Sequence, residues 1–338
     1  QSPMSSCSIP RSPPYVVLEI DFPPRAGHLN LSTMNEPWAS EYRLEVLDVA
    51  RIVSENTALD VQDARVLDEG WDFFCYLINN TFAFRFPKRR SEAERLINEN
   101  AFLAKLDLAI QTPRFDFWVD RPVGFDLPFA GYPLISGTPL FDIAEVDVDA
   151  STIGHQLGQV LRELHAQTLT PPRPTHDPIK TLLPGAHKEL KNIADVIGRS
   201  LFETCSTRLR SYRPRTPSEP HVTTHGDLHA GHVLVDSMGE LTGVIDWTDA
   251  HTSNRYIDFE GLWMWGGDTP VVAAMESCGC VPTREDWAQL RTHAIVNVVG
   301  LINFGFQIED FELVTTGRNW LKARQNEGVL DDFYANPV

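Results

Sequence analysis

The apolar positions of this chain follow two different periods along its length. Between residues 64 and 135 they form short runs rich in aromatic and β-branched residues, and turn residues separate these runs, which is typical of β-strands. Asn79-Asn80 between two of the runs predicts a tight hairpin. The expected strands are Ala64–Leu67, Phe73–Ile78, Thr81–Phe86, Arg114–Val119 and Phe129–Ile135.

Helical spacing governs most of the remaining apolar positions. They recur at intervals of three and four residues, which is typical of helices with one buried face. Ser91-Glu92-Ala93-Glu94 has the spacing of a capping box and predicts the start of a helix that runs to about residue 105. The other expected helices span residues 38–55, about 149–167, about 184–211, a segment from Asp258 to Met264, and two helices within 283–327.

Glu99 lies on the apolar face of its expected helix, because it comes three residues after Leu96 and four before Leu103. A carboxylate on a buried face is costly unless a cation pairs with it. The preceding strand ends with two cations, and either can supply the partner. These cations are Arg85 and Lys88. The alternative is that Glu99 is exposed at the edge of the apolar stripe.

The chain has 338 residues and a formal charge of −17, from 29 basic and 46 acidic residues. This length suits one large or two modest domains. The acidic balance argues against nucleic acid or an anionic membrane as a partner, and it is compatible with a cationic small substrate. Residues 1–33 are rich in Pro and Ser and lack periodicity, so we expect a poorly ordered leader.

The five cysteines are scattered, and their odd number is typical of a reduced, cytoplasmic protein. The spacing in Cys278-Gly279-Cys280 is too short for half of a usual zinc knuckle, and no second pair accompanies it. The sequence shows no signal-peptide pattern, and its most apolar window, Ala294 to Phe306, is too short and too interrupted to span a bilayer. We therefore expect a cytoplasmic protein.

The densest group of polar side chains is His225-Gly226-Asp227-Leu228-His229-Ala230-Gly231-His232. An apolar run, a turn and a second apolar run ending in Asp246 follow it, and this order predicts a loop and then a hairpin. The hairpin can bring the Asp246 carboxylate back beside Asp227. Two carboxylates and a neutral ligand suit Mg²⁺, which takes few protein ligands and completes its shell with phosphate oxygens and water.

The segments HGDLHAGHVLVD and GVIDWTDA resemble the catalytic and metal-binding segments of the antibiotic phosphotransferases, which share the protein-kinase-like fold. Most members have Asn where this chain has His232. The His form looks most like the macrolide 2′-phosphotransferases, and it is also similar to the aminoglycoside 2″-phosphotransferases. The match is dense over residues 225–262 and scattered over 65–165.

The resemblance implies an α+β fold with two lobes. Residues 34–136 would form a small nucleotide-binding N-terminal lobe with an antiparallel sheet, and residues 137–338 a larger, mostly helical lobe that holds the catalytic and acceptor-binding groups. Asp227 would orient or deprotonate the acceptor hydroxyl. His232 and Asp246 would hold the Mg²⁺ that bridges the nucleotide phosphates, because positioning and charge neutralisation carry most of the rate of phosphoryl transfer.

The phosphate donor implied by the resemblance is ATP or GTP. A cation on the third strand would contact the phosphates, where Arg85 is favoured by register and Lys88 is its rival, and Glu99 would hold that cation. The stretch from Ile135 to Gly137 resembles the linker between lobes, whose backbone groups would bind the nucleotide base.

The acceptor implied by the resemblance is a small antibiotic, cationic in character. A macrolide leads, with its sugar 2′-hydroxyl beside a dimethylamino group, and an aminoglycoside or a nucleoside antibiotic is the alternative. Glu260, Trp263 and Asp268 follow the hairpin and could line the acceptor pocket, with carboxylates attracting an amine. Packing on a helix face explains the tryptophan about as well.

Two other classes of function remain open on the residues alone. A zinc hydrolase could use His225, Asp227, His229 and His232 as ligands, because zinc favours imidazole. It would not explain the Ile245-Asp246-Trp247 end of the hairpin or the inward-facing acid upstream. A kinase-like binding protein without activity is disfavoured because both expected catalytic carboxylates are present.

Overall fold

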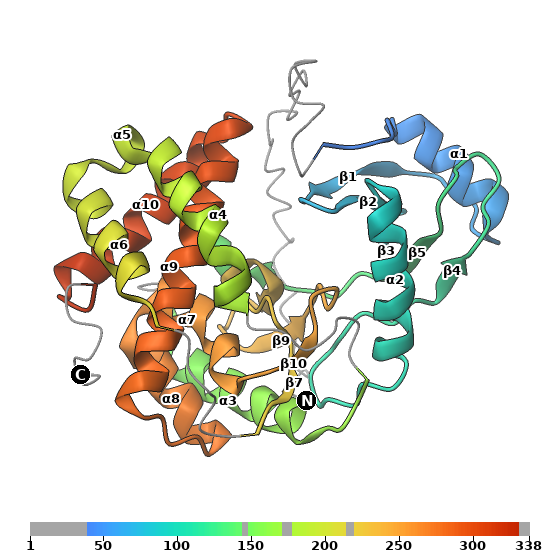
Figure 1. Ribbon diagram of the computed structural model, residues 1–338. Coiled ribbons are helices and arrows are strands. Elements are labelled where there is room, and N and C mark those ends of the chain that lie inside the picture. Colours follow the sequence, from blue (N-terminus) through green and yellow to red (C-terminus); the bar gives the residue numbers. More distant parts are fainter. Residues whose placement is uncertain (1–38, 144–147, 171–177, 214–219, 331–338) are drawn as a thin grey trace, which may run out of the picture.

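The computed structural model describes residues 39–143, 148–170, 178–213 and 220–330. The expected leader over residues 1–33 therefore lies outside the described residues. The described chain has two parts, which Figure 1 shows side by side: a β-sheet with helices α1 and α2, and a larger part rich in helices. Strands β7, β9 and β10 lie between them in this view. The division expected at residue 136 stays a prediction.

Within the described residues, the first part is a sheet of five strands in the order β1-β2-β3-β5-β4, and every neighbouring pair is antiparallel. Asn79 and Asn80 both have a φ of 53°, which is the conformation that a tight hairpin turn between β2 and β3 requires. The expected hairpin is confirmed. The strands are β1 (Ala64–Glu69), β2 (Phe73–Ile78), β3 (Phe82–Pro87), β4 (Phe117–Val119) and β5 (Phe129–Pro133).

Helices cover both faces of this sheet. α1 (Val46–Asn56) packs on the face that carries Phe84 and Phe86, whereas Leu96 of α2 (Arg90–Leu103) packs against Phe73 on the other face. Successive side chains of a strand point to opposite faces, so Arg85 faces α2.

The beginnings of both helices differ from the sequence expectation. α1 starts eight residues later than expected, because the preceding segment is not helical and is hydrogen-bonded to the end of β3: the backbone N–H of Glu41 and the Ser40 hydroxyl both donate to the carbonyl of Lys88. The predicted capping box at Ser91-Glu92-Ala93-Glu94 is wrong, because the N-terminus of α2 has no side-chain capping hydrogen bond. α2 begins at Arg90, and the Ser91 hydroxyl donates to the neighbouring Glu92 side chain.

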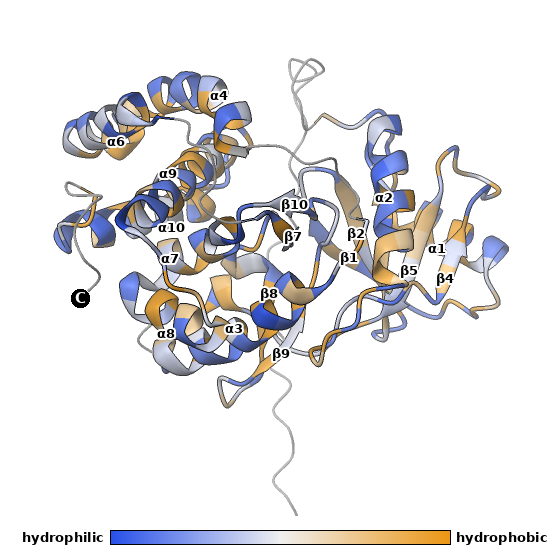
Figure 2. Cartoon of the chain, turned by 60° about the horizontal axis from the view of Figure 1, so that its bottom comes forward, coloured by the Kyte–Doolittle hydropathy of each residue, from blue (hydrophilic) through white to orange (hydrophobic). Residues whose placement is uncertain are grey.

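The second part, in the described residues, has small sheets of the orders β6-β8-β9 and β10-β7, surrounded by helices. Figure 2 shows apolar and hydrophilic residues on different sides of helices such as α4 and α6. The strands are β6 (Thr138–Pro139), β7 (Val222–Thr224), β8 (Val233–Val235), β9 (Leu241–Val244) and β10 (His251–Ser253). The α-helices are α3 (Ala150–Ala166), α4 (Pro178–Asn192), α5 (Ala194–Ile197), α6 (Arg199–Ser211), α7 (Glu260–Gly266), α8 (Asp268–Cys278), α9 (Arg284–Gln307) and α10 (Phe311–Asn326), and the 3-10 helices are η2 (Leu140–Asp142), η4 (Ala230–His232) and η5 (Arg255–Phe259).

Most of the helices expected in this part are present. α3, α9 and α10 follow the predicted spans, whereas the long helix expected over 184–211 is interrupted at Gly198, whose φ of 85° ends α5. α8 was not predicted, and it packs along α3: a Cβ on Gly154 or Gly158 would come within 2.2 Å of α8 backbone oxygens. Among the described residues, no helix combines the length and the apolar character that a membrane span requires.

Candidate active site

A buried carboxylate outside the polar loop holds that loop in place. Asp258 of η5 accepts hydrogen bonds from the backbone N–H groups of His225, at 3.2 Å, and Gly226, at 3.0 Å. Its Oδ2 also lies 2.9 Å from Nε2 of His165 on α3. Burial opposes the ionised form, but the hydrogen bonds from His165 and the loop backbone lower the pKa of Asp258 below its ordinary value. Asp258 therefore fixes the backbone at the start of the polar loop.

His225 is a structural residue of the loop. Its Nε2 donates to the carbonyl of Ile245 at 3.1 Å, and its Nδ1 accepts from the backbone N–H of Asp227 at 3.4 Å. Burial lowers the pKa of His225 to about 4, so the ring is neutral. Because backbone groups occupy both ring nitrogens, the zinc cluster of four residues that included His225 is not supported.

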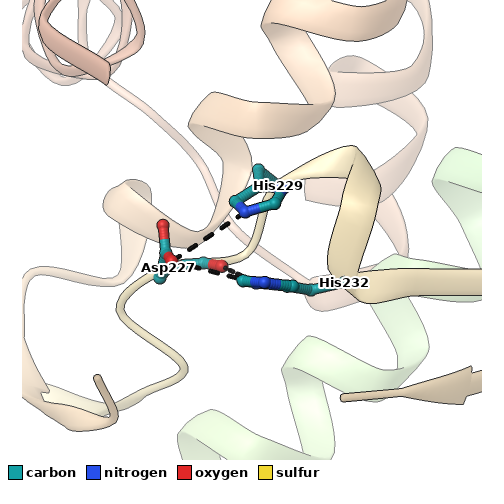
Figure 3. A group of neighbouring side chains, drawn as sticks. All are labelled: Asp227, His229 and His232. Carbon is teal, nitrogen blue, oxygen red and sulfur yellow. Dashed lines mark hydrogen bonds and ion pairs between the residues drawn. The ribbon is translucent and has the colours of Figure 1, made fainter. Parts of the chain in front are cut away.

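Asp227, His229 and His232 converge at the end of the loop (Figure 3). Their potential ligand atoms lie within 4.8 Å of one another. Oδ2 of Asp227 is 3.9 Å from Nε2 of His229 and 3.8 Å from Nδ1 of His232, and the two imidazole rings are 3.8 Å apart. Gly261 at the start of α7 permits this packing, because a Cβ there would come within 2.4 Å of the Cα of His229.

The Asp227 carboxyl lies in a surrounding that disfavours its charge, although 39% of the side chain is exposed. Burial of the carboxyl raises its pKa to about 6; the His232 ring opposes this rise, and the charges of Asp249 and Asp246 add to it. A carboxylate with a pKa close to neutrality is suited to accept a proton from a hydroxyl.

His232 and Asp246 present a nitrogen and an oxygen to the same space, and they fit a divalent cation. Nδ1 of His232 donates to the backbone carbonyl of Asp227 at 2.8 Å, which leaves Nε2 directed toward Asp246, 3.8 Å from its Oδ2. Ligating histidines commonly donate their other ring N–H to a carbonyl in this way. The tautomer of His232 therefore suits metal binding together with Asp246.

Asp246 is held in an uncommon backbone conformation with a φ of 60°. Its Oδ1 accepts from the Thr248 hydroxyl at 2.6 Å and from Nη2 of Arg85 at 3.0 Å, which leaves Oδ2 toward His232. Burial opposes the charge, but Arg85 and His232 outweigh it and hold the pKa of Asp246 well below its ordinary value. The carboxylate is therefore ionised and ready to bind a cation.

The inward-facing acid of α2 has the cationic partner that its position predicts. Nη1 of Arg85 lies 2.8 and 2.9 Å from the two oxygens of Glu99, whose side chain is fully buried. Glu99 also accepts from the backbone N–H of Trp247 at 3.1 Å, and its Oε2 lies 3.1 Å from the Thr248 hydroxyl oxygen. Arg85 therefore joins α2 to the segment that carries Asp246.

Lys88 has a different partner. Its Nζ lies 2.9 Å from Oε1 of Glu69 and 4.9 Å from the centre of the Phe74 ring. The Lys88 side chain thus pairs with Glu69 at the end of β1, whereas Arg85 pairs with Glu99. Of the two candidate cations, Arg85 is therefore the partner of Glu99.

Ile135 and Gly137 lie on the connection between β5 and β6. Ile135 packs with Ala83 and Leu234, and Gly137 adopts a φ of 143° where a Cβ would lie 2.4 Å from the Thr242 hydroxyl. The connection is thus packed against β8 and β9, beside the hairpin that leads to the metal-binding pair.

Asp227 also lies at a pocket between η2, α7, α9 and α10. Its lining is mainly apolar, with Glu260 and Asn297 as further polar groups. Oε1 of Glu260 accepts from the Asn297 amide at 2.7 Å, and burial raises the pKa of Glu260 to about 8, so this carboxyl is protonated at neutral pH. The apolar side chains of the lining include Phe141, Met264, Leu301 and Trp320.

Trp263 and Asp268 do not line this pocket. Trp263 is fully buried, and its indole N–H donates to Asp268 at 2.8 Å, while Arg291 donates to both oxygens of Asp268 at 3.0 Å. The two residues form a buried structural group, so of the three acceptor-pocket candidates the structure brings only Glu260 to Asp227. The helix-packing explanation of the tryptophan is the correct one.

Sequence reasoning missed several residues that complete the site. Asn297 lies in the middle of α9, and Thr248 follows the predicted metal-binding acid by two residues. Arg95 on α2 lies 2.6 Å from Asp72 and 2.9 Å from Asp249. No sequence signal pointed to Arg95, because α2 carries two arginines and three glutamates and so has no excess of cations.

The fold and the site together define a two-lobed protein of the kinase-like class, in which a sheet and a helical part meet at the polar loop that carries Asp227. Residues 63–292, well over half of the chain, match the phosphotransferase enzyme family, and the chain belongs to this family. A relative, the uncharacterized protein YcbJ of Bacillus subtilis (strain 168), is 23% identical over 271 residues, which cover 74% of this chain and 84% of the relative.

Solved structures share the fold. The GDP and kanamycin complex of APH(2″)-IIia has a TM-score of 0.66 and 22% identity, and the match covers 84% of this chain and 99% of that chain. Macrolide 2′-phosphotransferase MphH from Brachybacterium faecium has a TM-score of 0.53 and 19% identity, with 82% and 97% covered. The resemblance to antibiotic phosphotransferases, the α+β two-lobe fold and the enzyme class are confirmed, and a zinc hydrolase is not supported.

Proposed function

We propose that this phosphotransferase transfers the γ-phosphate of ATP or GTP to a hydroxyl of a small antibiotic, and that the acceptor is the 2′-hydroxyl of a macrolide sugar. The observation that carries this proposal is the position of Asp227, which lies both beside the metal-binding pair and at the mouth of an apolar pocket. An acceptor hydroxyl in that pocket would lie between the Asp227 carboxylate and the nucleotide phosphates.

The reaction requires a group that accepts the hydroxyl proton. It also requires the acceptor oxygen and the bridging oxygen of the nucleotide to lie in line with the γ-phosphorus. The acceptor oxygen forms a bond to the γ-phosphorus while the bond to the bridging oxygen of the nucleoside diphosphate breaks. Asp227 takes the hydroxyl proton on a carboxylate oxygen. The loop bonds to Asp258 keep that carboxylate in place during transfer.

His232 and Asp246 would hold Mg²⁺, which supplies neutralising charge to the phosphates when it is bound. Arg85 would add a second cationic contact to the phosphates from the sheet side, and Glu99 fixes its guanidinium in place. The backbone of the connection from Ile135 to Gly137 would bind the base. The solved relative that holds GDP supports a nucleotide as donor.

The pocket lining supports an acceptor with a large apolar face and a single amine. Met264, Leu301 and Trp320 offer apolar contacts, and Glu260 is the acid beside them. An ammonium group next to Glu260 would favour the ionised carboxylate and so oppose the burial that keeps it protonated. An aminoglycoside, which carries several amines, would need more acids than this lining supplies.

The test is a phosphotransfer assay on the full chain with a macrolide, kanamycin and a nucleoside antibiotic, each with ATP and GTP in parallel. We expect transfer to the macrolide and no transfer to a macrolide whose 2′-hydroxyl is acetylated. Phosphorylation of kanamycin in preference to the macrolide would contradict the acceptor. Tightly held zinc in the purified protein, with hydrolysis in place of transfer, would contradict the reaction itself.

A further inference from the structure

Two cysteines meet at the C-terminal end of α8. Cys278 ends the helix, Gly279 follows with a φ of 76°, and the backbone N–H of Cys280 turns back to the carbonyl of Met275 at 2.9 Å. This turn brings the thiols together, and the Cys278 thiol donates a hydrogen bond to Cys280. Their residues are 7% and 8% exposed, and the largely exposed Val281 follows them.

Polar groups around the pair favour a thiolate. Nη1 of Arg255 lies 3.8 Å from Sγ of Cys280. The hydrogen bond from Cys278 lowers the pKa of Cys280 to about 6; burial opposes this, and Arg255 adds to it. Burial raises the pKa of Cys75 and that of Cys205 to about 12, so those two remain thiols.

A continuous series of contacts leads from the cysteine pair to the catalytic loop. Sγ of Cys278 lies 3.7 Å from Nδ1 of His165, and Nε2 of His165 lies 2.9 Å from Asp258. Asp258 in turn accepts from the backbone of His225 and Gly226. A change at the Cys278 sulfur therefore acts, through His165, on Asp258, which holds the loop that carries Asp227.

We propose that Cys278 and Cys280 form a modification site at which a hydroperoxide oxidises the two thiols to a disulfide, and that this disulfide loosens the catalytic loop through His165 and Asp258. A reactive thiolate with a second cysteine beside it is the arrangement found at redox-sensing sites. The site is separate from the pocket and the metal-binding pair, and it goes beyond the proposed transfer reaction.

The chemistry balances with hydrogen peroxide as the oxidant. The Cys280 thiolate attacks one peroxide oxygen, so that an S–O bond forms, the O–O bond breaks, and the hydroxide that leaves takes up a proton to become water. The Cys278 sulfur then attacks the Cys280 sulfur, forming the S–S bond and releasing the second oxygen as water. Two electrons pass from the thiols to the peroxide. The Cys278 sulfur is then bonded to Cys280 and carries no proton, which changes its 3.7 Å contact with Nδ1 of His165.

The test is mass mapping of the full chain after treatment with hydrogen peroxide. The tryptic peptide 256–284 contains both cysteines. We expect it to lose two hydrogens and to regain them with dithiothreitol. Cys280→Ser should prevent this loss, whereas the matched variant Cys75→Ser should leave it unchanged. A peptide that keeps both thiols in the oxidised wild type, or that gains oxygen on one cysteine only, would overturn the site.

Hydrogen exchange of the same samples tests the coupling without any need for an acceptor. The backbone N–H groups of His225 and Gly226 donate hydrogen bonds to Asp258. We expect these two amides to exchange faster after oxidation of the wild type. In Cys280→Ser, their exchange rates should not change after the same treatment. A disulfide that forms while these amides keep their exchange rates would overturn the effect on the loop. Should Cys280→Ser fold poorly, Cys278→Ala serves as the second variant, and the wild-type measurements decide the site by themselves.

Discussion

At the scale of single residues, three acids of the site differ in pKa because their neighbours differ. The pKa of Asp227 is raised to about 6 and that of Glu260 to about 8, in both cases chiefly by burial, whereas the cation beside Asp246 lowers its pKa. One acid is therefore placed to accept a proton, one to bind a cation and one to stay protonated. This separation is typical of sites that use acids for different tasks.

Replacing Asp227 tests the proton acceptor. Asp227→Asn keeps the shape of the side chain but removes its basicity, so we expect kcat to fall by about 100-fold or more while the nucleotide KM stays nearly unchanged. Steady-state kinetics measure both. Asp195→Asn, on the exposed side of α5, is the matched control and should behave like the wild type. A loss in kcat of less than about tenfold, or about 1.4 kcal/mol, would show that Asp227 is not the base.

Replacing His232 tests the metal-binding pair. His232→Asn should retain activity, because an amide oxygen can take the place of Nε2, whereas His232→Ala should need more magnesium. A magnesium titration of activity compares the two variants with the wild type. His229→Asn is the control in the same loop and should titrate like the wild type. If His232→Ala also titrates like the wild type, the metal does not bind His232.

Glu260 should make the protein less stable as the pH rises. Its pKa is about 8 in the folded chain and has an ordinary value of 4.5, so between these values the folded chain holds a proton that the unfolded chain releases. The free energy of unfolding should therefore fall over that range. Glu260→Gln is neutral at every pH and should flatten the slope in chemical denaturation, whereas Glu276→Gln on the surface should not. Equal slopes in the wild type and Glu260→Gln would contradict a buried, protonated Glu260.

At the scale of elements, the alternation of β3 decides which cation meets α2. Arg85 points to the face that α2 covers, and the helical period places Glu99 opposite it. The same pair reaches Asp246 and Thr248 through the second guanidinium nitrogen. A buried ion pair with this many hydrogen bonds fixes the position of α2 relative to the metal-binding segment.

We expect Arg85→Ala to raise the nucleotide KM at least about tenfold, since about 1.4 kcal/mol of binding corresponds to this factor. Glu99→Gln should act in the same direction because it releases the guanidinium. Lys88→Ala, directly after the same strand, is the matched control and should leave the nucleotide KM nearly unchanged. Stability is measured in parallel, because breaking a buried pair costs about 3–5 kcal/mol. If only Lys88→Ala weakens nucleotide binding, Lys88 contacts the phosphates.

At the scale of the whole molecule, further contacts besides those of Arg85 and Glu99 join the sheet to the helical part. Arg95 binds both Asp72, on the connection between β1 and β2, and Asp249, beyond the metal-binding acid. The ring of Trp71 on the same connection lies 5.0 Å from that of Phe304 on α9. The connection between β1 and β2 thus contacts α9, which also lines the pocket beside Asp227.

A double-mutant cycle on Arg95→Gln and Asp249→Asn measures the contact between the two parts. The side chains are each 25% exposed, and we expect a coupling energy of about 0.5–3 kcal/mol in the free energy of unfolding. The exposed pair Arg51–Glu55 within α1 is the control and should give at most about 0.5 kcal/mol. A coupling for Arg95 and Asp249 no larger than this control would mean that the pair does not hold the two parts together.

The sequence by itself determined the elements and much of the site. Apolar spacing predicted the strands around Asn79-Asn80 and most of the helices, because periods of 2 and 3.6 residues are local properties of the chain. It also predicted a cation for Glu99, since an acid on a buried helix face must be paired. Where the expectation concerned a capping interaction, a competing local hydrogen bond of Ser91 decided otherwise.

Only the tertiary structure decided which residues meet across elements. Asn297 beside Glu260, Arg95 beside Asp249, and Cys278 beside His165 are separated by 37, 154 and 113 positions in the chain. Periodicity tells which face of an element is buried but not which element covers it. For that reason the pocket lining, the burial of Trp263 and the raised pKa values of the acids follow from packing rather than from any local pattern.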